Sequence, residues 1–372
     1  MKNVLHVYKT YFPDAPGGVQ EAIRAIALYT KDYGFQHSVF TLSSHPSPTE
    51  IEFEGSIIHR EKQIAEPLSC PIGGVRSFQQ MRRMAEEADL IVYHYPWPFG
   101  DLLSFSVHGK PSIVLYHSDI VKQKISSILY EPLRKVFLGR VNVIVATSPD
   151  YAQSSPVLQK VNQKLQIIPL TSIPDEGPED VRILNKYDLV SKHYVLFIGV
   201  LRYYKGLDTL VKAAKNINTK IVIAGDGPEK EHLMRLKASL GAENVIFTGE
   251  ISNAEKKALY MNASVFAFPS NARSEAFGIS LAEAAMYGLP MVSCKIGTGT
   301  SFINKSGDTG VEVKPSNANL FGEAINTILN SSRLANEMGV SAKNRWKKWM
   351  SPEVFGRRWA ELFVNLLDGK YK

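Results

Sequence analysis

Two carboxylates, Glu275 and Glu283, frame the stretch SEAFGISLAE, whose other residues are mostly small or apolar. The preceding run, 264–270, is apolar and aromatic and closes with proline and serine, which predicts a buried parallel strand. The following run, 278–290, is rich in helix formers and ends with glycine and proline, which predicts a helix. Glu275 is therefore expected on the loop at the carboxyl end of a strand, where open α/β sheets bind ligands. The alternative is a pair of solvated surface glutamates.

Two cations, Arg202 and Lys205, follow another apolar run, and Gly206 leads from them into a helical stretch. An arginine fork together with a mobile lysine ammonium suits a diphosphate. In the first half of the chain, Gly17 and Gly18 precede a helical stretch, where backbone N–H groups and the helix dipole attract anions. Solvated cations and an ordinary glycine turn are the alternatives for these two loops.

Short apolar runs alternate with helical stretches along the whole chain, which predicts parallel sheets. The strands expected in the first half lie at 4–8, 37–42, 90–95, 112–117, 142–148 and 165–170, and those in the second half at 194–199, 220–225, 244–249, 264–270 and 290–294. Residues 173–190 crowd proline, glycine and acidic residues and lose the periodicity, as in a linker. We therefore expect two doubly wound Rossmann-like domains, 1–172 and 191–350, with the ligand in a cleft between facing strand ends.

Composition narrows the class of protein. A chain of 372 residues, 44% hydrophobic and 21% charged, is expected to be globular and cytoplasmic, because no apolar run is long enough to cross a bilayer. Its two cysteines, Cys70 and Cys294, lie far apart in the sequence and fit a reducing compartment. The net charge of +7 suits phosphorylated ligands or an anionic membrane. Nucleic acid is not an expected partner, since no basic and aromatic recognition motif occurs.

Several familiar sites are missing from the sequence. GTGTSF supplies only the first two glycines of a dinucleotide fingerprint, and no P-loop spacing, Asp-x-Asp pair or G-x-S-x-G elbow occurs. No histidine or cysteine cluster has the spacing of metal ligands. We therefore expect a phosphate-binding protein with two α/β domains and with no cofactor or metal site.

Six motifs occur in the order and spacing of one known family: GGV at 17–19, YHSD at 116–119, ATSPDY at 146–151, RYYKGLD at 202–208, GDGPE at 225–229 and E-x7-E at 275–283. The sequence resembles the retaining nucleotide-sugar glycosyltransferases of family 4 over nearly its whole length. The resemblance implies the GT-B architecture, in which two Rossmann-like domains face each other across a cleft. It also implies that the last helix, within 351–372, packs back on the first domain.

The resemblance assigns roles at the donor site. Glu275 would face the transferred sugar near its anomeric carbon, and Glu283 would bind both ribose hydroxyls of the nucleotide. His117 would lie near the primary hydroxyl of the sugar; the alternative is a satisfied histidine at a strand end. The other donor-binding positions implied are Gly17, Gly18, Arg202, Lys205, Phe277, Gly278 and Ile279.

RYYKGLD and GTGTSF further resemble bacterial transferases that build O-antigen and other surface polysaccharides, often from GDP-mannose. The expected reaction moves mannose from GDP-mannose to a lipid-linked acceptor with retention of configuration. A UDP-sugar donor, a catalytically silent sugar-nucleotide-binding subunit and a sugar-nucleotide epimerase remain open alternatives.

A basic segment, 120–140, carries five lysines and arginines against Glu131 alone, with apolar residues at roughly helical spacing. It favours peripheral docking on the inner face of the plasma membrane, where a lipid-linked acceptor would be found. A helix that packs on its sheet with a basic outer side is the equal alternative.

The sequence departs from the family at one donor position. Many members carry an arginine directly after the strand's glycine, where this chain has Val200, and the nearest arginine is Arg202. We expect Arg202 to contact the diphosphate in place of the missing side chain, because Lys205 alone would leave departing charge uncompensated.

Arg202→Ala should therefore lower turnover with the active donor by about ten- to a thousandfold, and Arg202→Lys should restore it only partly because lysine lacks the planar fork. Steady-state kinetics measure both effects. Unchanged kcat and donor KM in Arg202→Ala would leave Lys205 as the cation at this position.

Overall fold

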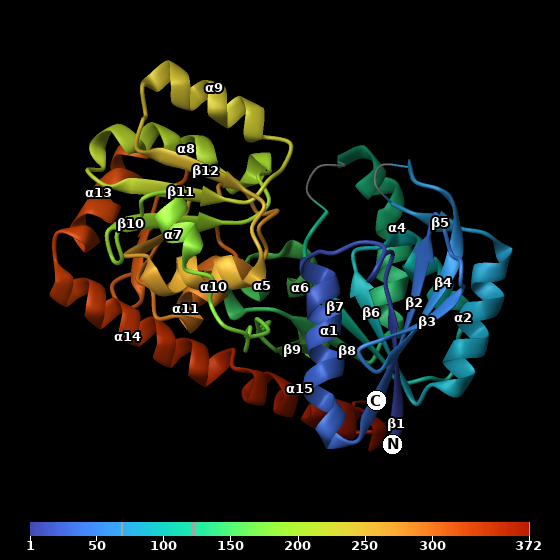
Figure 1. Cartoon of the computed structure of the whole chain (residues 1–372). Coiled ribbons are helices and arrows are strands. Elements are labelled where there is room, and N and C mark those ends of the chain that lie inside the picture. The colour runs from blue at the N-terminus through green and yellow to red at the C-terminus, as the bar shows by residue number, and fades with distance from the viewer. Residues whose placement is uncertain (68–69, 121–123, 372) are drawn as a thin grey trace. The chain divides into compact units, whose positions relative to one another are not determined.

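The computed structural model describes residues 1–67, 70–120 and 124–371. The chain forms two compact units, Met1–Thr171 with Pro352–Lys372, and Ser172–Ser351 (Figure 1). Each unit is an α/β layer structure built around its own sheet.

The sheet of the first unit runs in the order β3-β4-β2-β1-β6-β7-β8-β9, with β5 paired to β4. All pairs are parallel except β3 with β4 and β4 with β5. The strands are β1 (Lys2–Val7), β2 (Phe35–Ser43), β3 (Glu50–Phe53), β4 (Ser56–Ala65), β5 (Ile72–Gly73), β6 (Leu90–Tyr95), β7 (Ser112–Tyr116), β8 (Val143–Ala146) and β9 (Leu165–Ile167). The order reverses between β1 and β6, so the crevice of this sheet lies at their carboxyl ends.

The α-helices of the first unit are α1 (Gly18–Thr30), α2 (Val75–Glu87), α3 (Pro98–Leu103), α4 (Lys124–Arg140), α5 (Pro149–Ser154), α6 (Pro156–Gln159) and α15 (Pro352–Leu367). The last of these lies against α1, as Figure 1 shows. The rings of Phe363 and Phe35 meet edge to face with centroids 5.0 Å apart, and the Phe363 ring is fully buried. The chain thus returns at its end to complete the core of the first unit.

The sheet of the second unit is parallel throughout and runs β12-β11-β10-β13-β14-β15. Its strands are β10 (Tyr194–Ile198), β11 (Lys220–Ala224), β12 (Val245–Gly249), β13 (Val265–Phe268), β14 (Met291–Cys294) and β15 (Gly310–Val313). Read as 3-2-1-4-5-6, this is the order of a Rossmann sheet, whose ligand crevice lies where the order reverses, between β10 and β13.

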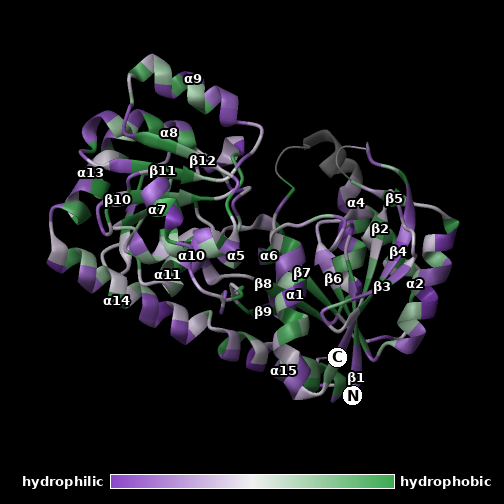
Figure 2. Cartoon of the chain, viewed as in Figure 1, coloured by the Kyte–Doolittle hydropathy of each residue, from purple (hydrophilic) through white to green (hydrophobic). Residues whose placement is uncertain are grey.

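The α-helices of the second unit are α7 (Arg182–Lys186), α8 (Leu207–Ala213), α9 (Lys230–Leu240), α10 (Asn253–Asn262), α11 (Ile279–Met286), α12 (Gly299–Ile303), α13 (Ala318–Leu329) and α14 (Ser332–Trp349). Figure 2 shows the central strands as largely hydrophobic and the surrounding helices as mixed. Every residue of β10, β13 and β14 is buried, as expected for parallel strands covered on both faces.

The structure confirms every strand expected from the sequence and adds β3, β4, β5 and β15. The longest of these, β4, was missed because charged residues interrupt its apolar pattern. One of them, Arg60, is buried and paired with Asp14 at 2.8 Å. Residues 173–190, expected as a linker, belong to the second unit, where Lys257 donates a hydrogen bond of 2.6 Å to the Gly177 carbonyl. None of the helices within the described ranges is long and apolar enough to cross a membrane.

The contact of α15 with α1 depends on a residue without a side chain. A Cβ placed on Gly356 would lie 2.2 Å from the Tyr29 carbonyl oxygen, so the two helix backbones approach too closely for alanine. Gly356→Ala should therefore lower the free energy of unfolding by about 1 to 3 kcal/mol. The control is Gly139→Ala in α4, where a Cβ meets nothing within 4 Å. It should be neutral or stabilising by up to about 1 kcal/mol. Urea unfolding measures both, and equal effects would contradict this account of the contact.

Candidate functional site

A buried ion pair lies at the point where the order of the second sheet reverses. Lys205 follows β10 and Glu275 follows β13, and the carboxyl ends of these neighbouring strands adjoin. The Lys205 ammonium donates to Oε2 of Glu275 at 2.5 Å, and Ser270 donates its hydroxyl to the same oxygen at 3.1 Å. The two charged side chains are 12% and 10% exposed. The structure thus brings together two predicted site residues and adds Ser270.

The two loops are held together by their backbones. Lys205 ends a short 3-10 turn that closes at Gly206 with φ of 61°, a left-handed conformation that favours glycine. A Cβ at Gly206 would lie 2.3 Å from the Pro269 carbonyl oxygen, and the Asn271 N–H donates to the Tyr204 carbonyl at 3.0 Å. The loop after β10 therefore cannot move away from the loop after β13 without breaking this contact.

The pair keeps unused hydrogen-bonding capacity. Among the described residues, Oε1 of Glu275 has no hydrogen-bond partner, and Lys205 donates only to Glu275. A carboxylate oxygen accepts hydrogen bonds and an ammonium carries three donors. The arrangement can therefore bind a ligand that offers a hydroxyl donor beside an anionic oxygen.

Glu283 is held by donors from a neighbouring helix. Its Oε1 accepts from the Lys256 ammonium at 2.8 Å, and its Oε2 accepts from the Tyr260 hydroxyl at 3.0 Å. Burial, reinforced by the nearby Glu283 charge, raises the pKa of Tyr260 well above its usual value, so the phenol stays protonated as a donor. Each carboxylate oxygen still has a second lone pair for a ligand hydroxyl. Lys256 and Tyr260 were missed because only the fold brings α10 beside α11.

Between the two glutamates, the chain turns into α11 through Gly278, whose φ is 95°. The following helix starts without a side-chain cap, and its first N–H groups have no intrahelical acceptor. Gly299, the first residue of α12, contacts this turn. Its N–H donates to the Ala276 carbonyl at 2.8 Å, and a Cβ there would lie 2.8 Å from the Phe277 ring. The backbone of residues 277–279 is thus fixed beside the ion pair.

Arg202 has a different environment from Lys205. Its side chain is exposed and makes no hydrogen bond or ion pair with any residue that the structure describes, and Val200 is also exposed. The backbone beside it is fixed, because the Leu201 N–H donates to the Asp226 carbonyl at 2.8 Å. The diphosphate role of Arg202 stays a prediction.

In the first unit, Gly17 and Gly18 lie at the start of α1, as expected. A Cβ at Gly17 would lie 2.6 Å from the Gln20 side-chain oxygen, whereas a Cβ at Gly18 would meet nothing within 4 Å. The space in front of Gly18 is therefore open to a ligand. The anion-binding role of the two glycines stays a prediction.

His117 is the end of a row of buried histidines that crosses the first sheet. Its Nε2 lies 3.0 Å from Nδ1 of His94, and the row continues through His6 to His37 with ring nitrogens 3.0 Å apart at each step. Burial lowers the pKa of His117 and of His37 to about 3, and those of His94 and His6 well below the usual value, so all four rings are neutral at neutral pH. The sequence analysis missed His6, His37 and His94. The signal that could have found them is that each of them, like His117, is the one histidine of a predicted strand.

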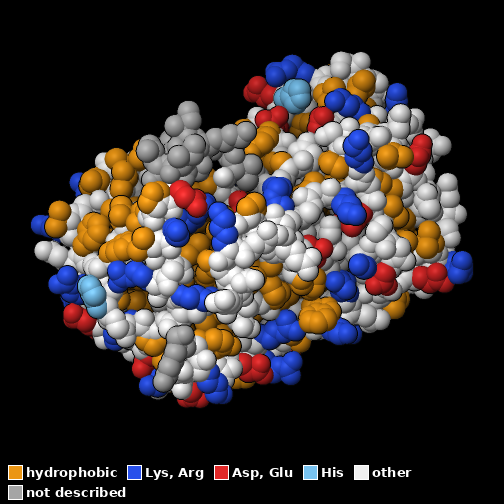
Figure 3. All heavy atoms as spheres, turned by 180° about the vertical axis from the view of Figure 1, so that it is seen from behind, with side chains coloured by type: hydrophobic (Ala, Val, Ile, Leu, Met, Phe, Trp, Pro, Cys, Tyr) orange, Lys and Arg blue, Asp and Glu red, His pale blue; other side chains and the backbone are white. Residues whose placement is uncertain are grey.

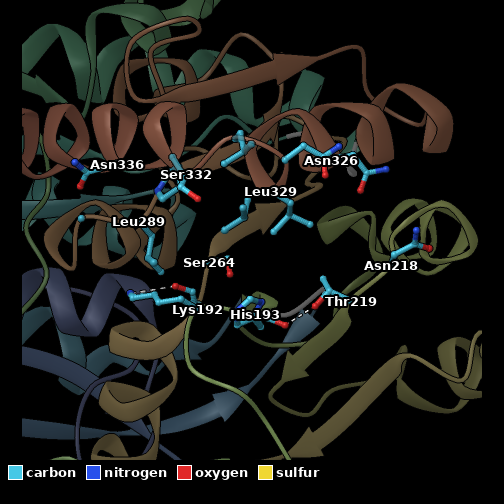
Figure 4. Close-up of a pocket in the computed structure, with 17 residues that line it drawn as sticks. Lys192, His193, Asn218, Thr219, Ser264, Leu289, Asn326, Leu329, Ser332 and Asn336 are labelled. Atoms are coloured by element: carbon cyan, nitrogen blue, oxygen red, sulfur yellow. Dashed lines mark hydrogen bonds between the residues drawn. The ribbon is translucent and has the colours of Figure 1, made fainter.

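The cavity in Figure 4 lies away from these residues. It has a volume of about 600 Å³ and is lined by residues that precede β10, β13 and β14, including His193, Ser264 and Leu289. These are the amino ends of the strands, opposite the edge at which open sheets bind ligands. Its one lysine, Lys192, donates to the Met261 carbonyl at 2.7 Å and the Ala263 carbonyl at 3.2 Å, so its ammonium ties down the end of α10. We therefore do not assign the donor to this cavity.

Comparison with known proteins identifies the family. A profile described as "Glycosyl transferases group 1" matches residues 182–345, and one described as "Glycosyltransferase Family 4" matches residues 16–170. The D-rhamnosyltransferase WbpZ of Pseudomonas aeruginosa is 40% identical over 348 residues, which cover 93% of this chain and 91% of that protein. This chain is a family 4 glycosyltransferase.

This glycosyltransferase is also 36% identical to O-antigen chain mannosyltransferase C of Escherichia coli, over 99% of each chain. Among solved structures, it matches sucrose-phosphate synthase from Thermosynechococcus elongatus with a TM-score of 0.80 and 21% identity, over 99% of this chain and 100% of that one. Anabaena HepE in complex with UDP-glucose matches with a TM-score of 0.77 and 17% identity, over 98% and 100%. These two likenesses extend to the fold, which is GT-B with two Rossmann-like domains.

The ion pair should also contribute to stability. Lys205→Met leaves the Glu275 carboxylate in a largely buried place with only the Ser270 hydroxyl, so it should lower the free energy of unfolding by about 3 kcal/mol. The control is Lys212→Met, which breaks an i,i+4 pair with Asp208 whose side chains are 50% and 37% exposed. It should change stability by no more than about 0.5 kcal/mol. Urea unfolding of the ligand-free protein decides, and similar losses in both variants would argue against a structural role for the buried pair.

Proposed function

We propose that this glycosyltransferase moves mannose from GDP-mannose to the growing chain of a lipid-linked bacterial O-antigen, with retention of configuration. The observation that carries the proposal is the 36% identity to O-antigen chain mannosyltransferase C over 99% of both chains. The similarity to WbpZ makes D-rhamnose, the 6-deoxy form of mannose, the second candidate for the transferred sugar.

The buried ion pair is proposed to act on the two halves of the donor. Lys205 donates to the oxygens of the departing diphosphate, where negative charge grows as the sugar leaves. Glu275 accepts from a sugar hydroxyl through Oε1, which has no partner in the described part of the chain, and this contact orients the ring toward the acceptor. In a front-face route, the leaving phosphate oxygen takes the proton of the attacking acceptor hydroxyl. We assign Glu275 to binding and charge stabilisation and do not assign it as a nucleophile.

The remaining donor contacts follow the same proposal. Glu283, oriented by Lys256 and Tyr260, accepts from the ribose hydroxyls. Backbone N–H groups at the start of α11 and at Gly18 donate to the sugar and the diphosphate, together with the exposed guanidinium of Arg202. We propose no metal ion or cofactor for the reaction. Neutralisation of the diphosphate is assigned to Lys205, Arg202 and these backbone N–H groups.

A lipid-linked acceptor would bring the enzyme to the cytoplasmic face of the membrane. The basic segment 120–140 was expected to dock there, but residues 121–123, with Lys122, lie outside the described residues. In the part whose side chains are described, Arg134 pairs with Glu131 and the Arg140 guanidinium lies 4.8 Å from the centre of the Phe105 ring. Peripheral docking therefore rests mainly on the acceptor chemistry. Figure 3 shows basic side chains interspersed with acidic and apolar ones on the face in view. Nucleic acid is not a proposed partner.

Release of nucleoside diphosphate from a panel of sugar nucleotides tests this function. With a lipid-linked O-antigen acceptor, the chain should release GDP from GDP-mannose and form an α-linked product, whose anomeric configuration NMR reports. Preference for GDP-D-rhamnose would select the second candidate. Release of UDP from UDP-sugars alone, or no acceptor-dependent release from any donor, would contradict the proposal.

The two glutamates should separate binding from turnover. Glu283→Gln keeps an acceptor for Tyr260 but loses one charged contact to ribose, so it should weaken donor and free GDP binding by about ten- to a hundredfold. Glu275→Gln should mainly lower kcat, by several-fold or more, because its contact strengthens as charge develops. Glu323→Ala, at an exposed position on α13, is the control. Calorimetric GDP binding and steady-state kinetics measure the split, and small, equal effects in all three variants would leave both glutamates with a structural role alone.

A further inference from the structure

The four histidines form a diagonal that follows from strand register. His37 on β2 pairs with Val4 on β1, and His6 lies two residues further along that strand. The same step of two residues leads from His6 to His94 on β6 and from His94 to His117 after β7, through the pairs His6↔Val92 and His94↔Leu115. Because side chains alternate with a period of two, every step keeps the histidine on the same face.

The far end of this histidine diagonal sets the direction of its hydrogen bonds. Nε2 of His37 lies 2.8 Å from the Thr30 hydroxyl, which also lies 2.7 Å from the Ile26 carbonyl oxygen. A carbonyl oxygen can only accept, so Thr30 donates its single hydroxyl proton to the Ile26 carbonyl oxygen. If that proton pointed to His37 instead, two oxygens would face each other at 2.7 Å without a hydrogen between them. Thr30 therefore accepts from Nε2–H of His37.

The remaining tautomers follow in sequence. A neutral imidazole has one donor and one acceptor nitrogen. With its proton on Nε2, His37 accepts at Nδ1 from Nε2–H of His6, which accepts at Nδ1 from Nε2–H of His94. His94 accepts at Nδ1 from Nε2–H of His117. Nδ1 of His117 is then a bare acceptor, and it has no partner among the residues that the structure describes.

We propose that Thr30, His37, His6 and His94 are positioning residues that hold His117 in its Nε2–H tautomer, so that Nδ1 accepts a hydrogen bond from a hydroxyl of the bound sugar. The inference rests on the proposed function for the identity of that sugar. His117 is 8% exposed and His6 is fully buried, so water has little access to the ring nitrogens and cannot readily change their tautomers. The fixed acceptor favours a sugar hydroxyl over a methyl group at the same place, because a methyl group would leave the nitrogen unpaired.

Two other uses of the row fit less well. Conduction of a proton away from the site would need a final base, but the row ends on a helix carbonyl. Metal binding would need nitrogens that converge on one point, whereas seven of the eight ring nitrogens already pair with a neighbouring ring or with Thr30. Positioning is the role that uses the geometry as it is.

Ring-nitrogen NMR of the histidine-labelled protein reads the tautomers without any assay of activity. The signals of His117 can be assigned by their loss in His117→Asn. We expect Nε2 of His117 to give a protonated, pyrrole-type signal and Nδ1 to give a bare, pyridine-type signal. A protonated Nδ1 with bare Nε2 in the wild-type protein, or a doubly protonated ring at neutral pH, would overturn the proposal.

Changes at Thr30 test the coupling from the far end of the row. Thr30→Val removes the final acceptor, and a buried N–H without a partner is less tolerated than a buried bare nitrogen. The row should therefore reverse, and His117 should move toward the Nδ1–H form, whereas Thr30→Ser keeps the hydroxyl and the wild-type signals. Donor KM should rise about tenfold in Thr30→Val, with a smaller change in kcat, and not in Thr30→Ser.

Unchanged His117 signals in a folded Thr30→Val protein would also overturn the coupling. The NMR readings stand whichever donor the enzyme uses, so failure of the mannose assignment would be seen separately, in the donor panel.

Discussion

An ionised side chain removed from water needs a partner of opposite charge, and this constraint organises the carboxyl edge of the second sheet. Lys205 and Glu275 are each largely buried, and each compensates the charge of the other. Their meeting requires two loops to approach so closely that residue 206 must lack a side chain. The ion pair forms because β10 and β13 are neighbours in the sheet, and it needs a glycine at position 206. The loop that carries Glu275 then leads through Gly278 into α11, which carries Glu283.

Satisfaction of buried polar groups shapes the first unit in a parallel way. Four of its histidines are buried along the parallel strands of its sheet, where most positions are aliphatic or aromatic. Such rings are tolerated because each one hydrogen-bonds to the next, and Thr30 ends the row against a carbonyl. Among the described residues, the single ring nitrogen of this row without a partner is Nδ1 of His117, within the YHSD run on which the resemblance to the family rests. A network that is complete except at one atom points to that atom as the place for a ligand.

The fold of this enzyme is shared with distant proteins, whereas its sugar specificity depends on a few local contacts. Sucrose-phosphate synthase shares the fold at 21% identity, and HepE, solved with UDP-glucose, shares it at 17%. The relatives at 40% and 36% identity are named for D-rhamnose and mannose, two sugars that differ only in the hydroxyl at C6. Discrimination between such donors depends on a few hydrogen bonds rather than on the scaffold. The acceptor role proposed for Nδ1 of His117 is of the kind that separates a hydroxyl from a methyl group.

The sequence alone determined the alternation of strands and helices, because parallel strands covered on both faces leave continuous apolar runs. It also placed Lys205 and Glu275 on loops after strands, and Glu283 in a helix, because local glycine, proline and helix-forming residues mark those boundaries. It missed β4, whose buried Arg60 is compensated by an ion pair with a residue far away in the chain. Only the tertiary structure decided that Lys205 meets Glu275 across 70 residues and that His6 meets His94 across 88. Strand order and register bring these side chains together, and no local periodicity contains that information, because it arises from the packing of the whole sheet.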